Sequence, residues 1–324
     1  MDENREKMPA EAVEIIKKVF GVWDCDITNI EIAKAGMTNR SFFFDCKGHK
    51  YIIRIPGEGT EQLIKRSEEE VVYRAIAGKG LCDDVIYINA KDGYKITKYV
   101  HNARVCNPMD MEDVALCLAK LKEFHRMRLG VAHEFDIYGQ IQYYEQLRQQ
   151  PSIYEDYEIT KASVWQLKPF VDCLPKEKIL THIDAVPDNF LFTSENEETK
   201  VQLIDWEYAG MQDPHVDIAM FCIYAGYGRD NIDHVIDLYF EGKCQLYERV
   251  KCYCYIASCG LLWSNWCEYK SRIGIEFGEY ALKQYLFAKE YSEIAAQYIR
   301  EGNLCEKWNT SEERLSWQRE QAAE

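Results

Sequence analysis

The sequence predicts an α+β fold with two lobes, in which an antiparallel sheet lobe at the N-terminus precedes a mainly helical C-terminal lobe. Short β-rich runs separated by Gly-containing turns fill much of residues 27–100. The composition shifts after His101, and from there apolar residues recur mostly at helical spacing. A length of 324 residues is sufficient for two domains. We therefore expect one domain over residues 1–100 and a second over residues 101–324.

The first lobe is expected to combine a sheet with two helices. Apolar residues at helical spacing predict a helix from Glu11 to Phe20. Three runs, ITNIEIAKAG, SFFFDC and KYIIRIPG, then predict an antiparallel meander. A helix over Thr60 to Gly80 has a Glu-rich entry and ends on Gly. The segment DVIYINAKDGYKITKYV follows as two strands around an Asp-Gly turn.

The second lobe is expected to open with a strongly amphipathic helix over Met109 to Leu129. Its clear strands are Asn189 to Thr193 and Val201 to Ile204. Further helices are expected over Gln140 to Gln150, His215 to Gly226, Ile232 to Gly242, Tyr247 to Tyr269, Gly278 to Arg300 and Thr310 to Ala322.

Charge and composition narrow the class of protein. The net charge of -15 argues against a nucleic-acid partner, because neutralising phosphates requires clustered Lys and Arg. An acidic field suits a cationic small molecule better. The 13 Cys residues stand without a CxxC pair, which is typical of thiols in a reducing compartment. The N-terminus is charged and the most apolar segment, Cys252 to Trp263, is too short to span a bilayer, so we expect a cytoplasmic protein without membrane insertion.

The stretch THIDAVPDNFLF, from Thr181 to Phe192, concentrates polar residues between apolar ones. Within it, His182, Asp184 and Asn189 have the spacing of a phosphotransfer catalytic loop. In such a loop the Asp accepts the proton of the attacking hydroxyl, and the Asn five residues on binds a metal ion. We therefore expect Asp184 to be the catalytic base and Asn189 to be a metal ligand.

A second carboxylate, Asp205, ends the apolar run VQLID. Phosphotransfer enzymes place their other metal-binding carboxylate at this point. Mg²⁺ prefers oxygen ligands and keeps several waters, so one carboxylate, one amide and the phosphates of ATP suffice. The sequence therefore predicts Mg²⁺ at Asn189 and Asp205, with ATP as co-substrate.

The first lobe should supply a cation for the phosphates. Arg54 stands on the apolar strand YIIRIPG, and a helix-borne carboxylate is expected to pair with it. Adjacent Glu68, Glu69 and Glu70 point three ways, so only one can face inward, and we favour Glu69. The turn AKAGMTNRS offers the hydroxyl of Thr38 and the amide of Asn39 to phosphates, although it also fits a common hairpin turn.

These segments resemble the choline/ethanolamine kinases, which belong to the aminoglycoside-phosphotransferase and protein-kinase-like fold. The resemblance covers nearly the whole chain and is tightest to the bacterial choline kinases. Its motifs are AGMTNRSF, YIIRIPG, KRSEEE, ITKYV, THIDAVPDNFLF, IDWEYAG and LLWSNWCEY. The motifs GxGxxG, DFG and APE of protein kinases are absent, which argues against a protein substrate.

The resemblance implies that ATP and choline react to give phosphocholine and ADP. Adenine is then expected against the backbone of Lys98 to Val100, with Arg54 on the phosphates. A trimethylammonium group offers no N–H, so aromatic faces must surround it. Trp263 and Trp266 lie three residues apart on a predicted helix, a spacing that is most often core in an unselected helix. In the family this pair walls the choline pocket.

Other acceptor contacts implied by the resemblance carry less sequence support. The segment DIAMFCIYAGY lacks a Glu found in eukaryotic relatives and leaves Tyr224 and Tyr227 near that place. The remaining residues expected around the acceptor are Glu207, Tyr208, Tyr227 and Tyr280.

Several rival functions remain open at this point. Ethanolamine kinase is the nearest rival. The two acceptors differ in recognition, because a primary ammonium binds carboxylate and carbonyl acceptors, whereas choline requires aromatic rings. Thiamine, aminoglycoside or methylthioribose phosphorylation would use the same catalytic residues. An inactive kinase-like binding protein is a further alternative, although the joint presence of Arg54, Asp184, Asn189 and Asp205 argues against it.

Overall fold

The computed structural model describes residues 8–33, 39–57, 59–82, 85–195 and 198–304. The chain divides into two compact units. One contains Met1–Val105 together with Leu191–Ala209, and the other contains Cys106–Phe190 and Gly210–Glu324. The first boundary lies near the one expected at residue 100, whereas residues 191–209 fall in the first unit because the chain returns there to form strands.

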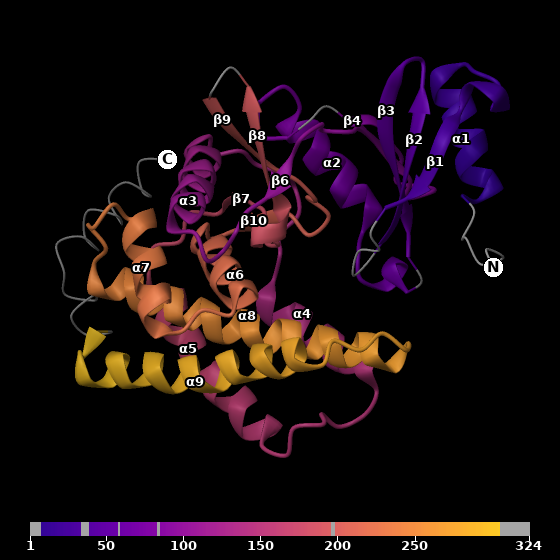
Figure 1. The fold of residues 1–324 in the computed structure, drawn as a ribbon. Helices are drawn as coiled ribbons and strands as arrows, with labels where there is room; N and C mark the ends of the chain where they lie inside the picture. Colours follow the sequence, from indigo (N-terminus) through magenta and orange to yellow (C-terminus); the bar gives the residue numbers. More distant parts are fainter. Residues whose placement is uncertain (1–7, 34–38, 58, 83–84, 196–197, 305–324) are drawn as a thin grey trace. The chain divides into compact units, whose positions relative to one another are not determined.

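The first unit contains a five-stranded antiparallel sheet with the order β1-β2-β3-β5-β4 (Figure 1). From Phe42 to Cys46 buried and half-buried residues alternate along β2, so one face of the sheet is buried. The α+β class and the antiparallel sheet are therefore confirmed. The strands are β1 (Thr28–Ile32), β2 (Asn39–Cys46), β3 (His49–Pro56), β4 (Val85–Ile88) and β5 (Lys95–Lys98).

Helix α1 (Ala10–Phe20) packs against one face of this sheet, on the side away from α2 (Figure 1). Its Ala12 and Ile16 are fully buried, one turn apart, and belong to the same apolar cluster as Phe42 and Ile53. Gly21 ends the helix in the left-handed conformation, with φ 61°.

Helix α2 (Arg66–Ile76) is shorter than the helix expected over Thr60 to Gly80. Residues Thr60–Gln62 instead form a 3₁₀ turn, and Lys65 precedes the helix in an extended conformation. The buried residues of α2 recur at helical spacing, and they are Glu69, Val72, Tyr73 and Ile76. A carboxylate thus lies on the apolar face of this helix.

A second sheet of the first unit has the order β6-β8-β9, built from β6 (Arg104–Val105), β8 (Phe190–Glu195) and β9 (Glu198–Leu203). The backbone N–H of Leu203 donates to the carbonyl of Leu81 at 2.8 Å, which holds the end of β9. Asp205 follows two residues later. The two strands expected over Asn189 to Thr193 and Val201 to Ile204 are therefore confirmed, with slightly different ends.

The second unit consists mainly of helices, as the sequence predicts. One of them, α5, was not expected, because Pro169 and several β-branched residues weaken its helical pattern. The helix expected over Thr310 to Ala322 lies outside the described residues. The helices are α3 (Met111–Arg126), α4 (Ile137–Arg148), α5 (Tyr157–Cys173), α6 (His215–Ala225), α7 (Arg229–Tyr239), α8 (Leu246–Arg272) and α9 (Glu279–Glu301).

Helix α8 is the central element of the second unit and runs beside α9 (Figure 1). Its residues from Val250 to Lys270 are all buried, which is typical of a helix surrounded by others. A Cβ at Gly260 would lie 2.7 Å from the Gln284 carbonyl oxygen of α9. Gly260 therefore permits the close approach of the two helices.

Two short strands frame the segment that carries the predicted catalytic loop. They are β7 (Ile179–Thr181) and β10 (Gly210–Gln212), and they pair antiparallel with Thr181 opposite Gly210. Neither was predicted, because three residues are too few to show a period. No helix in the described ranges is long and apolar enough to cross a bilayer.

Candidate active site

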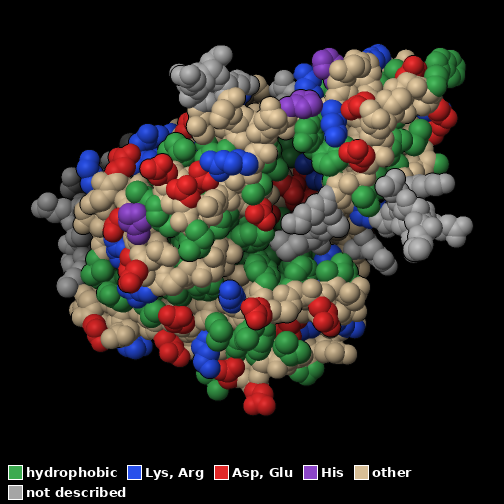
Figure 2. Space-filling model, viewed as in Figure 1, with side chains coloured by type: hydrophobic (Ala, Val, Ile, Leu, Met, Phe, Trp, Pro, Cys, Tyr) green, Lys and Arg blue, Asp and Glu red, His purple; other side chains and the backbone are tan. Residues whose placement is uncertain are grey.

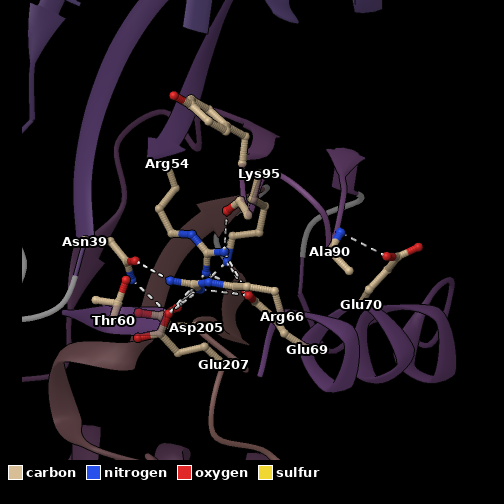
Figure 3. A network of polar contacts seen from close by, with 12 residues as sticks. Asn39, Arg54, Thr60, Arg66, Glu69, Glu70, Ala90, Lys95, Asp205 and Glu207 are labelled. Carbon is tan, nitrogen blue, oxygen red and sulfur yellow. Dashed lines mark hydrogen bonds and ion pairs between the residues drawn. The ribbon is translucent and has the colours of Figure 1, made fainter. Parts of the chain in front are cut away.

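The core of the site in the first unit is a buried ion pair between Arg54 on β3 and Glu69 on α2 (Figure 3). Arg54 Nη2 donates to Glu69 Oε2 at 2.8 Å, and Nη1 donates to the other carboxylate oxygen. Glu68 contacts Lys65 instead, and Glu70 contacts Arg74. The predicted pairing of Arg54 with Glu69 is therefore confirmed.

Both members of this pair are charged. Burial by itself opposes the charge of Glu69, but the positive charges of Arg54 and Lys95 outweigh it and lower the pKa of Glu69 to about 2. Burial likewise opposes the charge of Arg54, and the carboxylates of Glu69 and Glu207 overcome it and raise the pKa of Arg54. The guanidinium therefore stands on β3 as a permanent cation.

Asp205 follows β9 in a left-handed backbone conformation with φ 65°, which is uncommon for a residue other than Gly. Its Oδ1 is buried and has no hydrogen-bond partner among the described residues. Two cations stand near this oxygen, Arg54 Nη1 at 3.9 Å and Lys95 Nζ at 3.7 Å. The side chain is still 34% exposed, so the exposed part does not include Oδ1.

Lys95 is a cation that the sequence reasoning did not identify. It stands on β5 directly opposite Arg54 in the strand register and is 8% exposed. Burial and the nearby charge of Arg54 lower the pKa of Lys95. The alternation of residues along β5 was the available signal in the sequence. It could not identify Lys95, because the pairing of β5 with β3 was not known.

Glu207 joins the same network rather than standing apart from it (Figure 3). Its Oε2 accepts from Asn39 Nδ2 at 2.8 Å, from Arg66 Nη1 at 3.1 Å and from Arg54 Nη1 at 3.3 Å. Burial and the charge of Asp205 raise the pKa of Glu207. These contacts suit a residue that orders Arg54, and the role expected of Glu207 at the acceptor stays a prediction.

Arg66, which the sequence reasoning also missed, links this carboxylate to Asn39 and to Glu69. Its Nη2 donates to Asn39 Oδ1 at 2.9 Å, while its Nη1 also donates to Glu69 Oε2 at 2.9 Å. Asn39 begins β2 immediately after the predicted phosphate turn. Thr38, predicted in that turn, lies outside the described residues.

The other predicted residues of the first unit are placed as follows. Lys98 is exposed at the end of β5, and Val100 follows it half-buried. Tyr208 is buried, 7% exposed. The roles expected of these residues at adenine and at the acceptor stay predictions.

In the second unit, the predicted catalytic loop connects β7 to β8 and brings Asp184 and Asn189 together. Asn189 Nδ2 donates to the backbone carbonyl of Asp184 at 2.8 Å and to its Oδ2 at 3.1 Å. A 3₁₀ turn over Pro187–Asn189 makes this contact possible. The amide nitrogen of Asn189 faces Asp184, so the amide oxygen is the atom left to serve as a ligand.

A buried carboxylate on α6, Asp217, anchors the backbone of this loop. Its Oδ2 accepts from the N–H of His182 at 3.0 Å, and its Oδ1 accepts from the N–H of Ile183 at 2.7 Å. Asp217 Oδ2 also contacts His125 Nε2 at 2.9 Å, and the other ring nitrogen of His125 lies 2.8 Å from the Tyr239 hydroxyl. His125 is thus a buried residue whose two ring nitrogens both have partners.

The anchor holds a strained residue in place. Ile183 has φ 70°, a conformation that is an outlier for a β-branched side chain and costs on the order of 1–3 kcal/mol. The backbone hydrogen bonds to Asp217 offset this cost. Asp217 was missed because its partners are 34 and 35 residues away in the sequence.

Aromatic side chains of the second unit form a continuous cluster. The rings of Trp263 and Trp266 are 5.5 Å apart, and Trp266 packs on Phe277 at 5.0 Å. Tyr280 continues the cluster at 6.3 Å from Phe277 and 5.8 Å from Tyr224. The structure therefore brings three predicted residues, Trp263, Trp266 and Tyr280, into one cluster.

This aromatic cluster, defined by Tyr224, Trp263, Trp266, Phe277 and Tyr280, is joined to the catalytic loop. The Tyr224 hydroxyl donates to Asp188 Oδ2 at 2.7 Å. Burial raises the pKa of Tyr280, and the negative charge of Asp184 raises it further. The negative charge of Asp184 therefore acts on Tyr280, a member of the cluster.

Tyr227 is placed differently from the other predicted aromatic residues. Its hydroxyl donates to the backbone carbonyl of Pro108, and its ring lies 6.4 Å from that of Phe221. These contacts belong to the packing of α6 near the start of α3. The role expected of Tyr227 at the acceptor stays a prediction.

The residues present fit a magnesium ion. One ligand atom each of Glu69, Asp205 and Glu207 lie within 4.8 Å of one another. Glu69 and Glu207 are already engaged by Arg54 and Arg66, so Asp205 is the carboxylate of this group that is left for a metal. In the second unit Asn189 separately offers an amide oxygen, and carboxylate and amide oxygens are both hard ligands of the kind that Mg²⁺ prefers.

The family model described as Choline/ethanolamine kinase matches residues 30–242. The chain belongs to this family. A curated relative, Protein LicA of Haemophilus influenzae strain KW20/Rd, is 27% identical over 266 residues, which are 76% of this chain and 96% of the relative.

Solved structures support the fold of this kinase family member. The crystal structure of choline kinase LicA from Streptococcus pneumoniae superposes with a TM-score of 0.75 and 24% identity, covering 88% of this chain and all of that one, 100%. A structure of LicA in complex with AMP gives a TM-score of 0.74 at 24% identity, over 87% of this chain and 98% of that chain. The prediction of a kinase-like α+β fold is confirmed.

Proposed function

We propose that this kinase transfers the γ-phosphate of ATP to the hydroxyl of choline, giving phosphocholine and ADP. The observation that carries the acceptor is the aromatic cluster, which is joined through Tyr224 and Asp188 to the loop that holds Asp184. Ring faces attract a quaternary ammonium that cannot donate hydrogen bonds. The Streptococcus pneumoniae neighbour is named a choline kinase, which supports the same acceptor.

The residues of this chain divide the work of the reaction. Arg54, held by Glu69, binds phosphate oxygens of ATP. Asp184 orients the choline hydroxyl and takes its proton as the hydroxyl oxygen forms a bond to the γ-phosphorus. The bond from that phosphorus to the β-phosphate oxygen breaks, and ADP leaves. Catalysis of this kind consists mainly of positioning and of neutralising charge.

Mg²⁺ is the metal that we propose for Asp205 and Asn189. When bound with ATP it neutralises charge on the phosphates. Adenine is proposed to lie against the backbone of Lys98 to Val100. Asn39, which follows the predicted phosphate turn, is proposed to contact the phosphates of ATP. Because the proposed reaction consumes ATP, we also propose a cytoplasmic location.

Ethanolamine is the second candidate acceptor, since the matching family includes both kinases. A primary ammonium would need carboxylate and carbonyl acceptors, and Asp188, which is exposed beside Tyr224, is one such group. The ring cluster is larger than this acidic component, so choline is the better fit.

The test is ATP-dependent phosphorylation of choline, ethanolamine, thiamine and an aminoglycoside by the wild-type chain. We expect choline to have the highest kcat/KM, and Asp184→Asn to abolish turnover while leaving the fold intact by circular dichroism. Turnover of ethanolamine without turnover of choline would refute the assignment. If the wild-type chain is no more active than Asp184→Asn on any acceptor, the result would instead favour an inactive binding protein.

A further inference from the structure

Lys95 is a buried cation that the proposed reaction leaves unused. It is 8% exposed, and Lys is rarely buried unless it is paired. Because Lys95 stands opposite Arg54 in adjacent antiparallel strands, the two side chains point to the same face of the sheet. Two cations therefore share one small volume with Glu69 and Asp205 (Figure 3).

The contacts of Lys95 indicate which carboxylate depends on it. Its Nζ donates to the Tyr73 hydroxyl at 2.6 Å and lies 3.6 Å from Glu69 Oε1 and 3.7 Å from Asp205 Oδ1. Glu69 already receives hydrogen bonds from Arg54 and Arg66. Asp205 has no comparable partner at Oδ1, so Lys95 adds most to Asp205.

Asp205 needs to be held, for two reasons. Its backbone has φ 65°, and single residues in such sparsely populated regions cost on the order of 1–3 kcal/mol. Its Oδ1 is buried without a hydrogen bond, which leaves a charged atom to be stabilised by charge alone. Lys95 Nζ and Arg54 Nη1, at 3.7 Å and 3.9 Å, are the cations near that atom.

We propose that Lys95 is a positioning residue for Asp205. It holds the buried Oδ1 edge of the carboxylate, with Tyr73 fixing the Lys95 ammonium in turn, so that the exposed side of Asp205 is presented to the Mg²⁺ of bound nucleotide. Arg54 cannot do this alone, because its Nη1 already donates to Glu69 and Glu207 and its Nη2 already donates to Glu69 and to the Gly93 carbonyl. The proposal rests on the proposed function, in which Asp205 is a metal ligand.

Two other roles for Lys95 give different results in experiments. A direct contact to phosphate would make nucleotide binding depend on Lys95 even without metal. A role in charge balance alone would change stability but not metal affinity. Metal binding to the nucleotide complex therefore separates the three roles.

The experiment measures Mn²⁺ binding to the full chain with ADP bound, by electron paramagnetic resonance. It also measures ADP binding in EDTA by calorimetry. We expect Lys95→Met to weaken Mn²⁺ binding about tenfold or more, as removing a partner of a metal ligand commonly does. ADP affinity in EDTA should change by less than about threefold. Lys95→Arg should recover most of the Mn²⁺ affinity, and the exposed Lys91→Met should behave as wild type.

Each contrary result has a definite meaning. An equal loss of ADP affinity in EDTA would overturn the proposal in favour of a phosphate contact. Unchanged Mn²⁺ affinity in folded Lys95→Met would overturn it in favour of charge balance. If Lys95→Met does not fold, Tyr73→Phe removes only the hydroxyl that fixes Lys95, and it should weaken Mn²⁺ binding about threefold. No change in that variant would overturn the proposal.

Failure of this proposal can be distinguished from failure of the proposed function. A wild-type chain that binds Mn²⁺ and ADP but phosphorylates no choline would refute the acceptor and leave the role of Lys95 intact. If the wild-type chain phosphorylates choline but Lys95→Met binds Mn²⁺ normally, the proposed function stands and the role of Lys95 is refuted.

Discussion

At the scale of single residues, the negative charge of Glu69 stabilises the buried positive charge of Arg54. Arg54 and Glu69 are 5% and 1% exposed, so each charge would be costly without the other. The buried cations Arg54 and Lys95 and the half-buried Arg66 are balanced by the carboxylates of Glu69, Asp205 and Glu207. Removing one carboxylate should therefore destabilise the first unit as well as disturb nucleotide binding.

Glu69→Gln is expected to show this as a pH-dependent change in stability. The folded-state pKa of Glu69 is about 2, below the ordinary value of 4.5, so its stabilisation is complete above about pH 4.5 and is lost as the pH falls toward 2. We expect Glu69→Gln to lower the free energy of unfolding by about 3 kcal/mol at pH 7. The difference from wild type should shrink at pH 3, measured by urea unfolding.

Glu68→Gln is the matched control, because Glu68 is half-buried and its one ion pair among the described residues is with Lys65 at 3.2 Å in the same turn. It should change stability by less than about 0.5 kcal/mol at either pH. A Glu69→Gln deficit that is the same at pH 7 and pH 3 would show that the carboxylate charge is not the cause.

At the scale of elements, Asp217 connects α6 to the predicted catalytic loop. Asn in place of Asp217 keeps one acceptor oxygen, so one of the two loop N–H groups loses its partner. We expect Asp217→Asn to lower kcat about 100-fold, because small displacements of catalytic groups cost that much. The KM for ATP should change little. Steady-state kinetics would measure both.

The control for this prediction is Asp230→Asn in the first turn of α7, where the side chain is exposed. It should leave kcat unchanged. A folded Asp217→Asn enzyme with wild-type kcat would mean that the loop keeps its conformation without the carboxylate.

The aromatic cluster joins α8, α9 and α6, and its tryptophans have a structural as well as a proposed binding role. Trp263 and Trp266 are 5% and 2% exposed, and Trp263 Nε1 donates to Met220 Sδ at 2.8 Å. Substitution by Ala would therefore cost about 3–5 kcal/mol of stability and confuse the result. A less disruptive change is needed to test binding.

Trp266→Leu is expected to raise the KM for choline about tenfold, because a desolvated cation–ring contact contributes up to about 2 kcal/mol. The KM for ATP should stay the same, and thermal unfolding would monitor the fold. Trp165→Leu on α5, where the ring packs on Tyr138 at 5.1 Å, is the matched control. Equal choline KM values in both variants would contradict a binding role for Trp266.

At the scale of the whole molecule, the net charge of -15 is the feature that bears on function. Figure 2 shows Asp and Glu side chains spread among Lys and Arg over the visible face rather than gathered in one patch. A diffuse negative field of this kind attracts a monovalent cation weakly and is screened by salt. The charge therefore favours capture of choline without defining where it binds.

Raising the salt concentration from 50 mM to 300 mM is expected to lower kcat/KM for choline about two- to threefold at saturating ATP. The neutral isostere 3,3-dimethylbutan-1-ol, which lacks the charge, should show no such dependence. Initial-rate measurements on both acceptors would test this. The same salt dependence for both would mean that the field acts on ATP or on stability rather than on the cation.

Much of the fold follows from local pattern. The helices α1, α3, α6, α8 and α9 lie within a few residues of their expected bounds, because their apolar residues recur over several turns. The elements that the sequence missed are short, as with β7 and β10, or carry a Pro within a helix, as with α5. Their stability comes from pairing and packing with distant segments.

The site divides in the same way. Asp184, Asn189 and Asp205 could be found in the sequence because a short loop and the end of one strand require those residue types at close spacing. Lys95, Arg66 and Asp217 could not, since each contacts groups that stand far away in the chain and meet only when strands pair and helices pack. Local spacing thus predicts which groups would carry the chemistry, and long-range packing specifies what holds them in position.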